Sequence, residues 1–331
     1  MVKYSFLDLA YVTEDATIAE TFDKTLESAK CAELLGFERF WLAEHHNMDG
    51  VASSATSILI GFVAANTKTI RVGSGGLMLP NHSPLVVAEQ FGTLATLYPN
   101  RIDLGLGRAP GTDQLTASYI RPDFYENAQN FPKNVSLLQQ FLSSNNRNSK
   151  VRAIPGEGVD IPIWILGSST ESSVLAASFG LPYAFASHFA PGQIKAAFNF
   201  YKENFQVNDV LEKPYNLACI NVIVADSLQE AQKLATSFYM MFLGIIRNER
   251  KKMQPPIDSM DNVWSVNEEA MVRQMLTCSF IGTKEIVKRE LTNFLEKIPC
   301  SELMMSCPVY DLEARKLSMT YFSEIMAEIN E

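Results

Sequence analysis

Two adjacent imidazoles and a carboxylate follow a short apolar run in residues 40–47, which read Phe-Trp-Leu-Ala-Glu-His-His-Asn. An imidazole can accept or donate a proton near neutral pH, which suits it to general acid or base catalysis. Two histidines could instead bind a metal ion. Because consecutive side chains of a strand point to opposite faces, His45 and His46 are poorly placed to share one ion, and the sequence has no HxH or HExxH motif. We therefore expect a catalytic acid or base in this stretch and no metal.

A second group of residues has the composition of an anion site. Gly167, Ser168 and Ser169 lie at the expected junction of a strand and a helix, where free backbone N–H groups and the helix dipole favour a phosphate. Arg108 follows another strand and could bind the same phosphate through two parallel hydrogen bonds. The alternative is an ordinary helix cap, since Glu171 stands three residues after Ser168, as in a capping box. The junction by itself fits both interpretations.

Two glycine-rich segments limit the kind of cofactor. Residues 105–111 read Gly-Leu-Gly-Arg-Ala-Pro-Gly, but Pro110 stands where a dinucleotide fingerprint requires glycine, and a loop is expected next instead of a helix. The sequence has no Walker A motif either. Gly75 and Gly76 end a different strand, where bare backbone could form a bulge or turn, or admit a flat ring. We expect the anion to belong to a mononucleotide and not to ATP or NAD.

Short apolar strands alternate with helices along the chain, and this rhythm predicts a single parallel (β/α)8 barrel over residues 1–331. A doubly wound open sheet is the alternative that periodicity does not exclude. Insertions near 109–130 and 247–276, the second with its own short helix, account for the length beyond a typical barrel of about 250 residues. The expected strands are 4–9, 38–43, 70–76, 101–105, 161–166, 182–186, 217–225 and 302–306, and the expected helices are 17–35, 54–65, 84–97, 132–144, 169–179, 192–204, 227–246, 284–297 and 311–328.

The barrel hypothesis can be tested within the sequence, because catalytic residues of such barrels lie in the loops that follow the strands. The chain has 4 histidines, and each comes after an expected strand end: His45 and His46 after the second strand, His82 after the third and His188 after the sixth. This distribution favours an active site at the carboxyl ends of the strands.

Composition excludes several classes of partner. The 331 residues include 28 basic and 37 acidic side chains, and the net charge of -9 repels nucleic acid and anionic membrane surfaces. The 5 cysteines show no CxxC spacing, which indicates reduced thiols. We see no signal peptide and no apolar run near the roughly 20 residues that span a bilayer. We therefore expect a cytoplasmic protein without membrane or nucleic acid partners.

Several segments, taken together, resemble the bacterial luciferase-like, flavin-dependent monooxygenases along nearly the whole chain. They are Trp-Leu-Ala-Glu-His-His at 41–46, Val-Gly-Ser-Gly-Gly-Leu-Met-Leu-Pro at 72–80, Gly-Leu-Gly-Arg at 105–108 and Ile-Leu-Gly-Ser-Ser at 165–169. The run Gly-Arg-Ala-Pro-Gly-Thr-Asp at 107–113 is similar to an uncharacterised luciferase-like subgroup.

The resemblance implies a TIM barrel that binds FMN reduced by a separate NAD(P)H:FMN reductase. Reaction with O2 would give a flavin C4a-hydroperoxide that oxygenates a small organic substrate. His45 matches the catalytic proton donor or acceptor. Gly75 and Gly76 match a non-prolyl cis peptide beside the flavin ring, and Arg108 and residues 167–169 match the FMN phosphate site. A homodimer is also expected.

The chain departs from the luciferase pattern at the phosphate site, where Gly167 replaces an acidic residue and Thr170-Glu171 replace a hydroxyl pair. This leaves the phosphate contacts and light emission open. Two other functions remain possible: hydride transfer with the deazaflavin F420, and a non-catalytic FMN-binding barrel. Segments 109–130 and 247–276 are candidate lids that would keep water from the flavin. We expect His46 to be a supporting residue and Glu44 a carboxylate whose partner the sequence does not identify.

Overall fold

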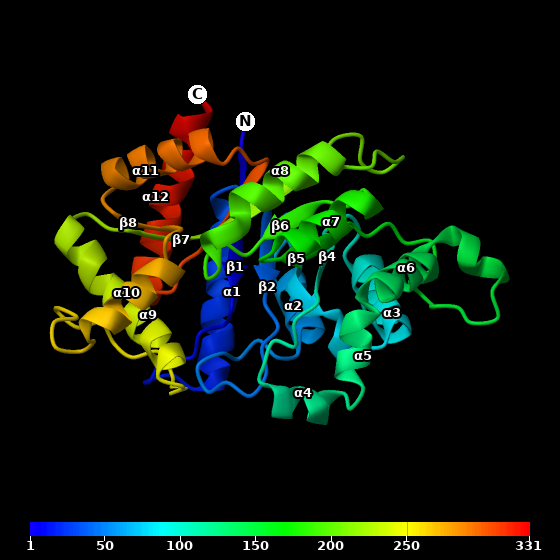
Figure 1. Cartoon of the computed structure of the whole chain (residues 1–331), viewed down its shortest axis with the longest axis horizontal. Helices are drawn as coiled ribbons and strands as arrows, with labels where there is room; N and C mark the ends of the chain where they lie inside the picture. Colours follow the sequence, from blue (N-terminus) through cyan, green and yellow to red (C-terminus); the bar gives the residue numbers. More distant parts are fainter. Residues whose placement is uncertain (250) are drawn as a thin grey trace.

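The computed structural model describes residues 1–249 and 251–331. Parallel strands form a closed 8-strand barrel with helices packed around it, which confirms the predicted (β/α)8 fold (Figure 1). Around the barrel the strands run in the order β6, β5, β4, β3, β2, β1, β9, β7, and β6 pairs with β7 to close it. The barrel strands are β1 Lys3–Asp8, β2 Arg39–Leu42, β3 Arg71–Met78, β4 Ile102–Gly107, β5 Ile163–Gly167, β6 Tyr183–Phe185, β7 Asn216–Val224 and β9 Glu302–Ser306.

The main helices lie close to their predicted positions. A capping box at Thr17 begins the first of them, in which the side chain of Glu20 bonds back to the Thr17 backbone. Buried residues of these helices pack against the outer face of the strands. The helices are α1 Ile18–Leu34, α2 Thr56–Ala65, α3 Pro84–Leu97, α6 Phe131–Leu142, α7 Thr170–Phe179, α8 Ile194–Asn204, α9 Leu228–Ile246, α11 Lys284–Lys297 and α12 Leu312–Asn330.

Two stretches differ from the prediction. The loop expected over 109–130 contains helices α4 (Gln114–Ile120) and α5 (Phe124–Gln129), because Asp113 caps α4 by accepting from the Thr116 amide. A short strand that was not expected, β8 (Ser279–Gly282), pairs with the second half of β7. Segment 247–276 does carry its own helix, α10 (Val266–Met275).

The interior of the barrel is divided into layers along its axis. Apolar side chains from several strands fill the middle, where the rings of Trp41 and Trp164 meet edge to face at 5.1 Å. Leu7, Leu217 and Met304 complete this layer from β1, β7 and β9. The layer separates the amino ends of the strands from the carboxyl ends, where the site lies.

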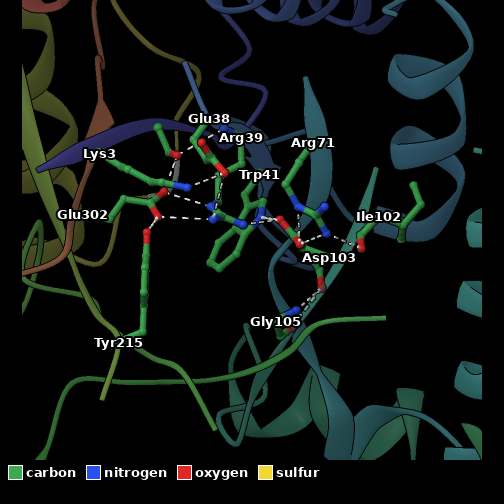
Figure 2. A network of polar contacts seen from close by, with 12 residues as sticks. Lys3, Glu38, Arg39, Trp41, Arg71, Ile102, Asp103, Gly105, Tyr215 and Glu302 are labelled. Carbon is green, nitrogen blue, oxygen red and sulfur yellow. Dashed lines mark hydrogen bonds and ion pairs between the residues drawn. The ribbon is translucent and has the colours of Figure 1, made fainter. Parts of the chain in front are cut away.

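Charged side chains close the amino ends of the strands (Figure 2). Arg39 of β2 donates to Glu302 of β9 at 2.8 Å and to Asp103 of β4 at 2.7 Å, and Arg71 of β3 reaches Asp103 at 2.6 Å. The Tyr215 hydroxyl, next to β7, donates to Glu302 at 2.8 Å. Burial alone would lower the pKa of Arg39, but Glu302 and Asp103 raise it, so the guanidinium stays charged.

Replacing Arg39 tests this network. R39M leaves two buried carboxylates without their shared cation, so we expect the free energy of unfolding to fall by about 3–5 kcal/mol in urea denaturation. K3M breaks the exposed 2.9 Å pair between Lys3 and Glu38 and should cost less than about 1 kcal/mol. Equal losses in the two variants would contradict the role given to Arg39.

Candidate active site

A cavity of about 500 Å³ opens at the carboxyl ends of the barrel strands. Its lining includes every residue predicted for the site: His45, Gly75, Gly76, Arg108, Gly167, Ser168 and Ser169. Residues far apart in the sequence therefore meet around one space, as the barrel hypothesis requires. The cavity lies above the apolar layer, with Leu7, Ala43 and Leu166 toward the barrel interior.

His45 presents a neutral imidazole to the cavity. Burial is the main cause of a pKa below the usual histidine value, and the hydrogen bond to the Gly111 backbone and the nearby Glu44 only partly oppose it. The Nδ1 atom lies 3.2 Å from the carbonyl oxygen of Gly111. Because a carbonyl only accepts, this contact assigns the proton to Nδ1 and leaves Nε2 as a free acceptor. Such an imidazole can take up a proton at Nε2 and return it.

His46 turns away from the cavity, as the alternation of side chains predicts. Its Nε2 contacts Glu44 at 3.0 Å, and His82 Nε2 contacts the same carboxylate at 2.9 Å. Glu44 also accepts from the Met78 amide at 3.0 Å and from Asn81 Nδ2 at 3.1 Å. Burial alone would raise the pKa of Glu44, but the hydrogen bonds from His46, His82 and Met78 lower it to about 2. The partners that the sequence did not identify are therefore His46, His82, Met78 and Asn81.

Gly111 connects segment 109–130 to the catalytic stretch. Its carbonyl accepts from the His46 amide at 3.1 Å in addition to His45 Nδ1. Its φ is +65°, and a Cβ there would lie 2.5 Å from the Glu44 carbonyl oxygen, so only glycine fits. Asn81 Nδ2 donates to the Pro110 carbonyl at 3.0 Å. Several hydrogen bonds thus hold this segment against the barrel.

The two candidate lids differ in position. Segment 109–130 forms part of the cavity wall through Ala109, Gly111, Ala128 and Gln129. Among the described residues of 247–276, none lines the cavity. Met253 in that segment pairs instead with the backbone of Val12 and Glu14. The described residues of 247–276 are therefore not part of the cavity wall, and a lid role for this segment stays a prediction.

Gly75 and Gly76 bring bare backbone to the cavity. The peptide bond between them is cis, as the resemblance implied, and the pairing of β3 with β4 shifts register between Ser74 and Leu77. A Cβ on Gly75 would lie 2.7 Å from a Leu7 methyl carbon. Glycine is therefore the residue that leaves this wall of the cavity without a side chain.

The expected anion end contains an ion pair. Arg108 Nη2 lies 2.8 Å from Glu171 Oε2. Helix α7 begins at Thr170, and its N-cap residue Ser169 makes no capping hydrogen bond through its side chain. The alternative interpretation, a capping box of Ser168 and Glu171, is therefore wrong, because the Glu171 carboxylate contacts the arginine instead.

His188 lines the cavity as well, although the sequence suggested no role for it beyond its position after a strand. Burial, with a smaller effect of nearby His45, lowers its pKa to about 3. Its Nδ1 has no hydrogen-bond partner among the described residues. The sequence also gave no signal for the apolar wall formed by Phe131, Val174 and Leu175, because helices of a barrel usually cover the outside of the strands.

Within residues 1–249 and 251–331, no three histidine, cysteine, aspartate or glutamate side chains are grouped to hold a metal ion. No helix there is long and apolar enough to cross a membrane.

Comparison with known proteins identifies the family. The model of the luciferase-like monooxygenase family matches residues 3–298, and the chain therefore belongs to this family. It is 47% identical over 328 residues to a luciferase-like monooxygenase of Escherichia coli strain K12, covering 99% of this chain and 98% of the relative. It is 48% identical over 326 residues to Bacillus subtilis YvbT, covering 98% and 96%. The N-acetyl-S-alkylcysteine monooxygenase of Bacillus subtilis is 31% identical, with 98% of both chains covered.

Solved structures share the fold. Apo-MsnO8 superposes with a TM-score of 0.87 at 29% identity and 99% coverage of both chains. The oxygenating constituent of 3,6-diketocamphane monooxygenase from Pseudomonas putida, in complex with FMN, gives a TM-score of 0.77 at 17% identity, covering 99% of this chain and 98% of that one. An F420-dependent secondary alcohol dehydrogenase gives 0.71 at 13% identity, covering 100% and 99%. At these last two identities the likeness concerns the fold alone.

Replacing Glu44 tests the hydrogen-bond cluster. E44Q should lower the free energy of unfolding by about 3 kcal/mol at pH 7, because the folded state holds the carboxylate at a pKa near 2 against 4.5 for the free group. A lowered folded pKa stabilises the protein above pH 4.5, and this contribution is lost as the pH falls toward 2. The difference in the free energy of unfolding between E44Q and wild type should therefore disappear over this pH range. E269Q, at an exposed helical ion pair, is the control and should change stability by less than about 0.5 kcal/mol. A difference in the free energy of unfolding that stays constant with pH would contradict the stabilisation of the ionised Glu44 by this cluster.

Proposed function

We propose that this protein is a flavin-dependent monooxygenase that uses reduced FMN from a separate NAD(P)H:FMN reductase, together with O2, to oxygenate a small organic substrate. The observation that carries the proposal is the single cavity that joins His45, the bare backbone at Gly75 and Gly76, and the anion end at Arg108. Reduced flavin would supply the two electrons that activate O2. Membership of the luciferase-like monooxygenase family supports the same reaction class.

The residues of the cavity fit FMN by their chemistry. Arg108 offers a fixed positive charge, and Ser168 and Ser169 offer hydroxyl and backbone donors to the phosphate. The isoalloxazine ring would lie against the backbone of Gly75 and Gly76. Delivery of electrons by FMN is consistent with the incomplete dinucleotide fingerprint at 105–111.

His45 is the residue that would move a proton. Its Nδ1–H is held by the Gly111 carbonyl, so Nε2 can accept a proton from a reacting group or return one to it. The lowered pKa keeps the ring neutral and ready to accept at neutral pH. His188, also neutral, could hydrogen-bond a polar group of the substrate.

The cavity favours a small and largely apolar substrate. Among its described lining residues, the side chains that carry charge at neutral pH are Arg108 and Glu171, and both lie at the anion end. Phe131, Leu175 and neighbouring apolar side chains would keep water from the reacting atoms. Thioethers belong in a substrate screen beside aldehydes and alkanes, because one relative is named as an N-acetyl-S-alkylcysteine monooxygenase.

An anaerobic complex with reduced FMN, mixed with O2 in a stopped-flow instrument, tests the function. We expect oxidised flavin to appear more slowly than in free solution, and 18O2 to label the product of a screened substrate. H45N should bind FMN but turn over about 100-fold more slowly, because the proton acceptor is lost. Flavin oxidation at the free-solution rate would reject the monooxygenase. Unchanged turnover in H45N would reject His45 as the proton acceptor. Absence of labelled product with every screened substrate would favour a non-catalytic flavin carrier, and tighter binding of F420 than FMN in a titration would favour hydride transfer.

We also propose a homodimer, built on helices α2 and α3, which pack against each other. Ile58 of α2 is 72% exposed, and Phe62, Val86 and Leu97 are exposed apolar residues of the same two helices. Light scattering should give twice the mass of the 36.9 kDa chain. I58E should shift the protein to a monomer, whereas V210E, at a loop residue that is 85% exposed, should not. A monomeric wild type would reject the dimer.

A further inference from the structure

The ion pair between Arg108 and Glu171 occupies the end of the cavity at which the flavin phosphate would bind. Arg108 follows β4 and Glu171 lies in the first turn of α7, and their charged atoms are 2.8 Å apart. Both side chains line the cavity. His45 and His188 are neutral, since the pKa of each is lowered by burial. The carboxylate of Glu171 therefore cancels the one fixed cation among the described lining residues.

Capping, one usual role of an acidic residue in the first turn of a helix, does not account for Glu171. Such a residue ordinarily stabilises the helix through its dipole or a cap. Here the Thr170 amide bonds to Gln193 Oε1 at 3.0 Å, and the Ser169 side chain makes no cap. Because one amide of the helix start is already taken, a phosphate would depend more heavily on Arg108, the group that Glu171 holds.

We propose that Glu171 competes with the flavin phosphate for Arg108 and so weakens the binding of FMN relative to a site without the carboxylate. This inference rests on the proposed function. The side chains of Arg108 and Glu171 are 55% and 71% exposed, so their pair is weak and can open when a phosphate arrives. A flavin held in this way exchanges readily, which suits FMN that is carried from a reductase and returned after each turnover.

Equilibrium binding of two probes, FMN and riboflavin, tests the competition, because riboflavin lacks the phosphate. E171Q removes the competing charge and keeps the side chain's size, so we expect the Kd of FMN to fall about fivefold at low salt while that of riboflavin stays constant. R108Q should raise the Kd of FMN toward that of riboflavin. In the R108Q background, E171Q should no longer lower the Kd of FMN, because the arginine for which Glu171 competes is gone. The effects of the two substitutions on the Kd are therefore not additive.

The dependence on salt and a control variant distinguish the competition from other causes of a changed FMN affinity. The gain in FMN affinity caused by E171Q should shrink as ionic strength rises, because screening weakens interactions of exposed charges. E269Q breaks an exposed ion pair on α10 and should leave both flavin affinities unchanged. An unchanged or raised Kd of FMN in E171Q, or equal changes for both flavins, would overturn the inference while leaving the flavin site intact. Failure of wild type to bind either flavin would reject the proposed function itself.

Discussion

The barrel depends on one arginine that two buried carboxylates share. Arg39 is only 5% exposed, and its guanidinium bonds to Asp103 and Glu302 on strands that are not its neighbours. Uncompensated charge in such a place would cost several kcal/mol, so the strands β2, β4 and β9 can settle only in the register that brings the three groups together. Their alternation of inward and outward side chains is then set along the whole strand. The position of His45, beyond the end of β2, follows from that register.

The two ends of the barrel differ in the polar groups that they leave without partners. At the amino ends, charged groups are paired within the protein, and Trp41 Nε1 adds a hydrogen bond to Asp103 at 3.1 Å. At the carboxyl ends, His45 keeps an open acceptor and His188 Nδ1 has no partner among the described residues. Unsatisfied polar groups are costly in a protein interior, and they concentrate where a ligand can satisfy them. The apolar layer around Trp164 insulates one end from the other.

The alternation of apolar strands and helices favoured the barrel, and the site residues predicted at the strand ends line one cavity, because a barrel brings its strand ends together. The apolar wall of that cavity was not predicted, because it comes from helices outside the strands. Strand β8 was not predicted either; it is only four residues long and lies next to an insertion. Contacts between residues far apart in the sequence could not be predicted: His82 is 38 residues from its partner Glu44. The spacing of Ser168 and Glu171 also fitted a helix cap, which the structure does not contain, because Arg108, which lies 63 residues away, takes the Glu171 carboxylate. Local spacing identifies the groups available, and only folding decides which of them meet.

The carbonyl of Gly111 accepts from both the ring of His45 and the backbone of His46. The same atom therefore anchors a wall of the cavity and fixes the tautomer of the imidazole. A movement of segment 109–130 large enough to widen the cavity would withdraw this acceptor and free the proton on Nδ1. Such a movement would therefore also leave the imidazole without the acceptor that sets its tautomer in this structure.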